Sequence, residues 1–110
     1  MQPQYYIGLM SGTSMDGVDA VLVAMHGSRW HAAEAHAFLP YPDDLKQRLL
    51  ALQPAGQNEL HRSQMLAQEL SCLYAEVVQK LLRETQMQPA HIRAVGCHGQ
   101  TVRHAPEHGY

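Results

Sequence analysis

Two short polar segments contain residue types that can bind a phosphorylated or hydroxylated ligand. The first motif spans residues 8–19 and reads GLMSGTSMDGVD. Its glycines Gly12 and Gly17 permit positive φ angles and a close approach to the backbone, and successive N–H groups in such a turn can hold an anion. Thr13 and Ser14 add hydroxyl donors for phosphate oxygens. The motif predicts a phosphate-binding turn, although its composition equally suits a plain hairpin turn.

The first motif matches neither of two common nucleotide-binding patterns. It lacks the spacing and the lysine of GxxxxGK[ST], and it is not GxGxxG. Its carboxylates, Asp16 and Asp19, cannot hold phosphate directly. A carboxylate can hold Mg²⁺ through water, however, and the ion then bridges to the phosphates. We therefore predict Asp16 as a magnesium-binding residue and not as a catalytic base.

The second motif spans residues 96–101 and reads GCHGQT, at the end of a short apolar run. Open α/β sheets bind ligands at the carboxyl ends of buried strands. His98, Gln100 and Thr101 can hydrogen-bond sugar hydroxyls or an acetamido group, and Arg103 can meet a carboxylate. The alternative is that His98 and Gln100 only tie down a loop.

The spacing of the histidines and cysteines disfavours a metal site and a catalytic thiol. His98, His104 and His108 lack the spacing of tetrahedral Cys/His sites. Cys97 and His98 are adjacent on a predicted strand and so point to opposite faces, which prevents a nucleophile–base pair. We expect Cys97 to be buried and inert.

Apolar periodicity and turn residues predict an α/β chain of order β-β-β-α-α-β. Both faces of the second strand are apolar, so we expect it to be covered on both sides. Asn58 is expected to cap the long helix, whose leucines and valines recur every three or four residues. The expected strands cover residues 5–10, 18–25, 30–39 and 92–97, and the expected helices begin near residues 43 and 58, with the second ending near residue 86.

Composition excludes several classes of protein. The 110 residues suit one domain, and the net charge of −2 provides no basic patch for nucleic acid or an anionic membrane. The chain has no signal-peptide pattern and no apolar run near the ~20 residues of a membrane span. Cys72 and Cys97 are far apart, which favours free thiols in a reducing compartment. We therefore expect a cytoplasmic protein.

The two motifs resemble the signature segments of the anhydro-N-acetylmuramic acid kinases. The resemblance extends over the whole chain, including the spacing between the motifs and the two intervening helices. It implies the fold of the acetate kinase, sugar kinase, Hsp70 and actin superfamily, of which this chain would be a partial ribonuclease-H-like (actin-like ATPase) domain. It also implies that ATP phosphorylates 1,6-anhydro-N-acetylmuramic acid as water opens the ring, in peptidoglycan recycling, and it is compatible with a homodimeric full-length enzyme.

The resemblance assigns residues to both substrates. His98, Gln100 and Thr101 match a family motif near the sugar. The residues that match the ATP phosphate motif are Gly12, Thr13, Ser14, Met15, Asp16, Gly17, Val18 and Asp19.

The length of the chain departs from the family pattern, because members run to a few hundred residues. We expect residues 1–110 to be the amino-terminal part of the first actin-like lobe, and to be inactive alone. The general base is expected beyond Tyr110, so no catalytic residue is assigned. The alternatives are another sugar kinase of the superfamily or a non-catalytic nucleotide- or sugar-binding module. A ribonuclease-H-type nuclease is disfavoured by the absence of a basic surface.

Overall fold

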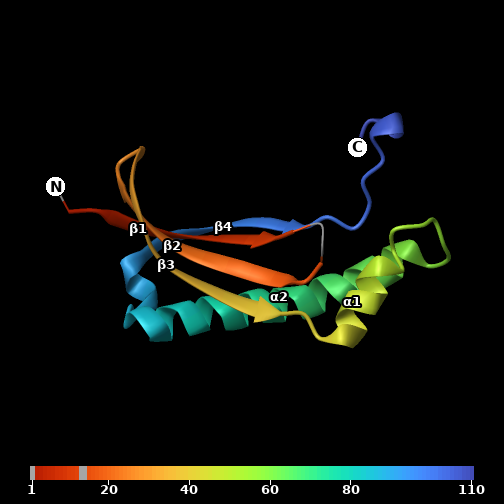
Figure 1. Ribbon diagram of the computed structural model, residues 1–110, viewed down its shortest axis with the longest axis horizontal. Coiled ribbons are helices and arrows are strands. Elements are labelled where there is room, and N and C mark those ends of the chain that lie inside the picture. The colour runs from red at the N-terminus through yellow and green to blue at the C-terminus, as the bar shows by residue number, and fades with distance from the viewer. Residues whose placement is uncertain (1, 13–14) are drawn as a thin grey trace.

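The computed structural model describes residues 2–12 and 15–110. One four-stranded sheet packs against two helices (Figure 1), so the predicted α/β class is confirmed. In chain order the elements are β1 (Gln4–Ser11), β2 (Gly17–His26), β3 (Arg29–Pro40), α1 (Asp43–Leu50), α2 (Glu59–Thr85) and β4 (Ile92–Gln100), with short 3₁₀ turns at Pro89–His91 and Pro106–His108.

The sheet brings the two motifs to one edge. Its strand order is β3-β2-β1-β4, with β1 antiparallel to β2 and parallel to β4. Ser11, at the end of β1, is opposite Val18 on one side and Gln100 on the other. The β1–β2 turn runs from Gly12 to Asp16. Gly12 therefore lies beside the carboxyl end of β4, although about 90 residues separate the two in the sequence.

The core lies on one face of the sheet only. Both helices are on the same side (Figure 1), where the leucine and valine stripe of α2 meets β2 and β3. Ala20, Leu22 and Ala24 are buried there, whereas Val21 and Val23 on the opposite face of β2 are half-buried. The expectation that β2 is covered on both sides is therefore wrong, because neither helix packs on the second face.

Helix α2 begins differently from the prediction. Asn58 occupies the N-cap position but has a left-handed backbone with φ of 54°, and its side chain makes no capping hydrogen bond. Asparagine tolerates this conformation better than most residues. The Glu59 carboxylate instead accepts a hydrogen bond from the backbone N–H of Gly56 at 2.9 Å. The predicted side-chain cap is wrong, but the 27-residue helix, about 40 Å long, ends at the expected position.

Strand β4 is longer than predicted and includes most of the second motif. Leu9 pairs with Cys97 but Ser11 pairs with Gln100, so β4 contains one extra residue at this point. Gly99, with φ of 83°, is compatible with such a bulge. His98 and Gln100 therefore lie within the strand and not beyond it.

The environment of β4 also differs from the prediction. Cys97 is exposed, contrary to the expected burial, because β4 is at the edge of the sheet while α2 crosses β2 and β3. Cys72 is exposed as well, and the predicted free state of both thiols is confirmed. Among the described residues, no helix combines the length and the apolar character that crossing a membrane requires.

Candidate functional site

The two motifs touch each other directly. The Gln100 side chain, at the end of β4, donates from Nε2 to the carbonyl oxygen of Gly12 at 3.1 Å. Gly12 is the last described residue before Thr13 and Ser14, which lie outside the described residues. The second motif therefore supports the start of the β1–β2 turn.

The β1–β2 turn is anchored through its backbone and by one apolar side chain. The N–H of Met15 donates to the Gly12 carbonyl at 3.1 Å, and the N–H of Tyr41 donates to the Asp16 carbonyl at 2.9 Å. Met15 has φ of 57°, and its side chain is 1% exposed. Burial of the Met15 side chain in the core offsets the cost of this left-handed backbone.

Gly17 has a role that differs from the sequence interpretation. Its φ is not positive, so the turn does not use Gly17 for a left-handed conformation. A Cβ atom at this position would lie 2.3 Å from the carbonyl oxygen of Leu39 and 2.6 Å from the Phe38 ring. The glycine is required because β2 packs too closely on β3 to admit a side chain.

The two carboxylates of the first motif do not converge. Asp16 Oδ1 lies 3.0 Å from Lys46 Nζ on α1. Asp19 Oδ1 lies 2.7 Å from His36 Nε2 on β3, on the sheet face away from the helices. No group of three or more His, Cys, Asp or Glu side chains converges within the described parts of the chain.

A chain of hydrogen-bonded side chains connects α2, β1, β4 and the loop between β3 and α1. Tyr74 Oη on α2 lies 3.2 Å from Ser11 Oγ on β1, which lies 2.7 Å from Tyr41 Oη. Tyr41 Oη also lies 3.0 Å from Gln100 Oε1. We call these four residues the hydroxyl chain.

Tyr41 is the donor at the centre of the hydroxyl chain. Its single hydroxyl proton is directed toward two acceptors, Ser11 Oγ at 2.7 Å and Gln100 Oε1 at 3.0 Å. Between Ser11 and Tyr74 either hydroxyl can be the donor. Tyr41 is 6% exposed, and burial raises its pKa to about 12. Its hydroxyl therefore keeps the proton at neutral pH.

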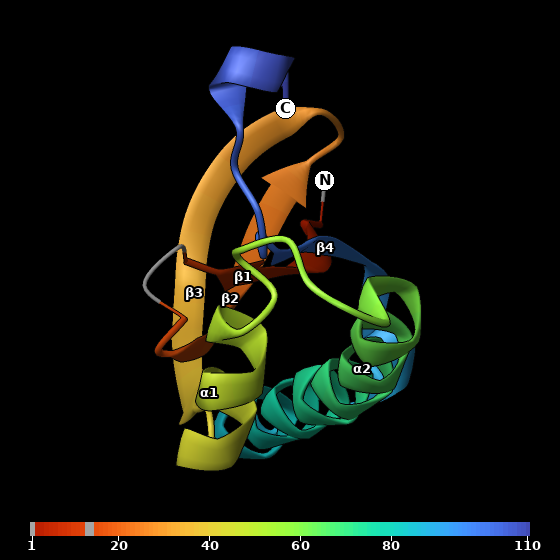
Figure 2. The same ribbon diagram turned by 90° about the vertical axis from the view of Figure 1, so that its right-hand side faces the viewer.

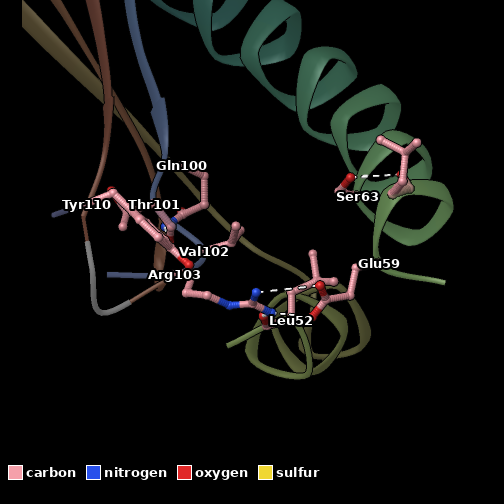
Figure 3. Close-up of a pocket in the computed structure, with 9 residues that line it drawn as sticks. Leu52, Glu59, Ser63, Gln100, Thr101, Val102, Arg103 and Tyr110 are labelled. Carbon is pink, nitrogen blue, oxygen red and sulfur yellow. Dashed lines mark hydrogen bonds and ion pairs between the residues drawn. The ribbon is translucent and has the colours of Figure 1, made fainter. Parts of the chain in front are cut away.

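A cavity of about 580 Å³ opens beside the second motif (Figure 3). Gln100 and Thr101 line it, whereas His98 does not. Cys97 shares a face of the sheet with buried Leu9, so the neighbouring His98 lies on the face away from the helices. The structure thus brings together two of the three predicted sugar-site residues and separates the third. The lining residues are Leu52, Glu59, Leu60, Ser63, Gln100, Thr101, Val102, Arg103 and Tyr110.

Arg103 lines one side of the cavity, and its guanidinium is hydrogen-bonded to groups of this chain. Its guanidinium donates to the carbonyl oxygens of Leu52 at 2.8 Å, Gln53 at 3.0 Å and Pro54 at 3.1 Å, and it pairs with the Glu59 carboxylate (Figure 3). This pairing lowers the pKa of Glu59 below its ordinary value. The carboxylate that Arg103 binds thus belongs to Glu59 of the same chain. Arg103 holds the segment after β4 against the α1–α2 loop. Beyond this contact the segment rises away from the helices (Figure 2).

Sequence reasoning missed Tyr41, Tyr74 and Lys46. Tyr41 lies between Pro40 and Pro42, where only a strand end was predicted. Ser11 continues the inward alternation of Ile7 and Leu9. A polar residue at such a buried position needs a partner, and this was the signal that could have revealed the hydroxyl chain.

Comparisons with known proteins agree on one family. The family model described as anhydro-N-acetylmuramic acid kinase matches residues 4–110. A protein of that name from Neisseria meningitidis serogroup C is 64% identical over all 110 residues. Others, from Chromobacterium violaceum and Nitrosomonas europaea, are 53% and 49% identical over 96% of the chain. The chain spans about 30% of the length of these relatives. It belongs to the anhydro-N-acetylmuramic acid kinase family.

Proposed function

We propose that this chain supplies the phosphate-binding part of an ATP-dependent kinase acting on 1,6-anhydro-N-acetylmuramic acid. In this reaction water opens the anhydro ring and the 6-oxygen takes the γ-phosphate. The products are N-acetylmuramic acid 6-phosphate and ADP, in peptidoglycan recycling. The observation that carries the proposal is the hydrogen bond between Gln100 Nε2 and the Gly12 carbonyl, which joins the two motifs of the family.

The proposal extends to the architecture and location of the enzyme. Residues 1–110 would form the amino-terminal part of the first lobe of an actin-like kinase. The mixed sheet with helices on one face is compatible with half of such a lobe. The enzyme would act in the cytoplasm, as a homodimer. Cell fractionation and sedimentation of the full-length kinase test these two points, and activity in the membrane fraction or a monomeric mass would contradict them.

The ATP phosphates are assigned to the β1–β2 turn and its flanks. Gly12 and Asp16 are exposed there, whereas Met15 and Val18 point into the core. The buried residues can contribute only backbone groups, which suits the anion-binding role of a turn. The proposed contact residues are Gly12, Thr13, Ser14, Met15, Asp16, Gly17, Val18 and Asp19.

The sugar is assigned to the second motif. Gln100 and Thr101 line the cavity beside the turn, which supports their part of the assignment. His98 lies on the other face of the sheet and is included for its place in the family motif. No catalytic base is assigned among these residues.

The activity is tested with a full-length kinase that contains this segment. We expect ADP release that depends on 1,6-anhydro-N-acetylmuramic acid and is absent with glucose or N-acetylglucosamine. Turnover of the simple sugars alone would reassign the protein to another sugar kinase. Binding of ATP without turnover of any sugar would indicate a non-catalytic module.

Mg²⁺ is proposed to bind beside the turn through Asp16. Protein sites often hold this ion through only one or two carboxylates, with the rest supplied by water and substrate phosphates, so one exposed carboxylate fits. The ion would neutralise charge on the phosphate oxygens. Lys46, 3.0 Å from Asp16 Oδ1, would hold the carboxylate at the edge of the turn.

Asp16→Asn in the full-length kinase is expected to raise the Mg²⁺ concentration needed for half-maximal rate and to lower kcat. The amide keeps the shape of the side chain but loses its charge. Asp44→Asn is the matched control, since Asp44 is an exposed carboxylate that pairs with Arg48 on α1. An unchanged Mg²⁺ titration of the Asp16 variant would remove the metal assignment.

A further inference from the structure

Both described ends of the β1–β2 turn are linked to Tyr41. At the Asp16 end, the backbone N–H of Tyr41 donates to the carbonyl oxygen at 2.9 Å. At the Gly12 end, the Tyr41 hydroxyl holds Gln100, whose amide donates to the Gly12 carbonyl. One residue thus contacts the turn by its main chain and supports it by its side chain.

The position of Tyr41 is itself fixed by its surroundings. Proline has no N–H, so Tyr41 carries the only backbone donor among residues 40–42, and that donor goes to Asp16. Its ring is buried in the core cluster, immediately before α1 begins at Asp43. Tyr41 is not among the residues that line the cavity, so any effect on a ligand there passes through Gln100.

Nearly all the hydrogen-bonding capacity of the Gln100 side-chain amide is satisfied by groups of the chain itself. Its two N–H groups donate to the carbonyls of Gly12 at 3.1 Å and Thr101 at 2.9 Å, while Oε1 accepts from Tyr41 at 3.0 Å. A ligand in the cavity would therefore meet an amide that is already oriented. A shift of Thr101 on ligand binding would move the same amide that holds Gly12.

We propose that Tyr41 is a positioning residue that, through Gln100, links occupancy of the cavity to the positions of Gly12 and Asp16, the described ends of the β1–β2 turn. This inference rests on the proposed function, in which the turn holds ATP phosphates and the cavity receives the sugar. Sugar binding would then tighten ATP binding, and ATP would tighten sugar binding by the same factor. Tyr41 contacts neither substrate.

Tyr41→Phe in the full-length kinase tests the link, because phenylalanine fills the buried site and lacks only the hydroxyl. We expect the KM for ATP to rise about tenfold, the size expected from loss of one buried hydrogen bond, with a smaller change in kcat. Binding of a non-hydrolysable ATP analogue is then measured with and without the anhydro-sugar. The wild type should bind the analogue more tightly with the sugar, and the variant should show nearly equal affinities.

Two further variants make the result decisive. Tyr6→Phe is the matched control, since within the described part of the chain the Tyr6 hydroxyl bonds only to exposed Gln4, and it should retain wild-type kinetics and linkage. Gln100→Glu keeps the acceptor for Tyr41 but replaces the donor that holds Gly12, so it should reproduce the loss of linkage. It also covers the case in which Tyr41→Phe does not fold.

The outcomes separate this inference from the proposed function. Wild-type ATP affinity and wild-type linkage in Tyr41→Phe would overturn the role of Tyr41, and the same result in Gln100→Glu would overturn it if Tyr41→Phe does not fold. If Gly12→Val abolishes ATP binding in the same assay, the phosphate-binding turn stands and only the inference fails. If Gly12→Val also leaves ATP binding intact, both fail.

Discussion

Gly12→Val in a full-length kinase carrying this segment is expected to lower turnover at least about a hundredfold while leaving the fold intact. Phosphoryl transfer depends mainly on positioning and charge stabilisation, and a misplacement of about 1 Å can cost a hundredfold. The Gly12 carbonyl accepts from both Met15 N and Gln100 Nε2. The backbone therefore cannot easily move aside, and an added isopropyl group would occupy the space that a phosphate needs.

The measurements are kcat, the KM for ATP and a thermal melt. Gly56→Val is the control, because Gly56 is exposed in the α1–α2 loop and an added Cβ would meet only the flexible end of Arg62 at 3.2 Å. We expect this control to retain turnover. Wild-type kcat and ATP affinity in Gly12→Val would exclude the turn from the ATP site.

Most of the secondary structure could be predicted because it follows local patterns. The spacing of Leu66, Leu70, Val77 and Leu81 predicted one face of a long helix, and all four are buried. The strands were predicted from short apolar runs between turn residues, and their centres agree with the structure. Local periodicity is sufficient here because the helical repeat of about 3.6 residues alone places these apolar side chains on one face.

The errors concern features that depend on distant parts of the chain. The exposure of Cys97 and the half-buried second face of β2 depend on where α2 crosses the sheet, which periodicity does not encode. The extra residue near Gly99 exists because β4 pairs with β1, about 90 residues earlier. Asn58 has the right residue type for a cap, but its left-handed backbone prevents the side-chain bond.

The candidate site likewise combines residues that local patterns predict with residues whose partners are distant in the sequence. The residue types of the two motifs predict a phosphate turn and a sugar site, and both assignments stay predictions. The hydrogen bond between Gln100 and Gly12 shows that the two motifs are in contact. Tyr41 and Tyr74 could not be found by spacing, because their partners are Ser11 and Gln100 on strands far away in the sequence. Gly17 was interpreted as a ligand-facing glycine, whereas its contacts are with β3.

Gly17→Ala is expected to destabilise the full-length kinase by about 3 kcal/mol or more, a large part of a typical stability of about 5–15 kcal/mol. The added methyl carbon would lie 2.3 Å from the Leu39 carbonyl oxygen and 2.6 Å from the Phe38 ring. The ring can rotate, but the carbonyl belongs to a paired strand, so β3 would have to separate from β2. We expect a lower melting temperature and less soluble protein.

Two comparisons define the cause of that loss. Gly96→Ala is the matched control, because a Cβ at Gly96 meets no heavy atom within 4 Å, and its melting temperature should match the wild type. Adding Phe38→Ala to Gly17→Ala should restore only part of the stability, since it removes the ring contact but not the carbonyl contact. A Gly17→Ala variant that melts normally would show that the packing of β2 on β3 does not require the glycine.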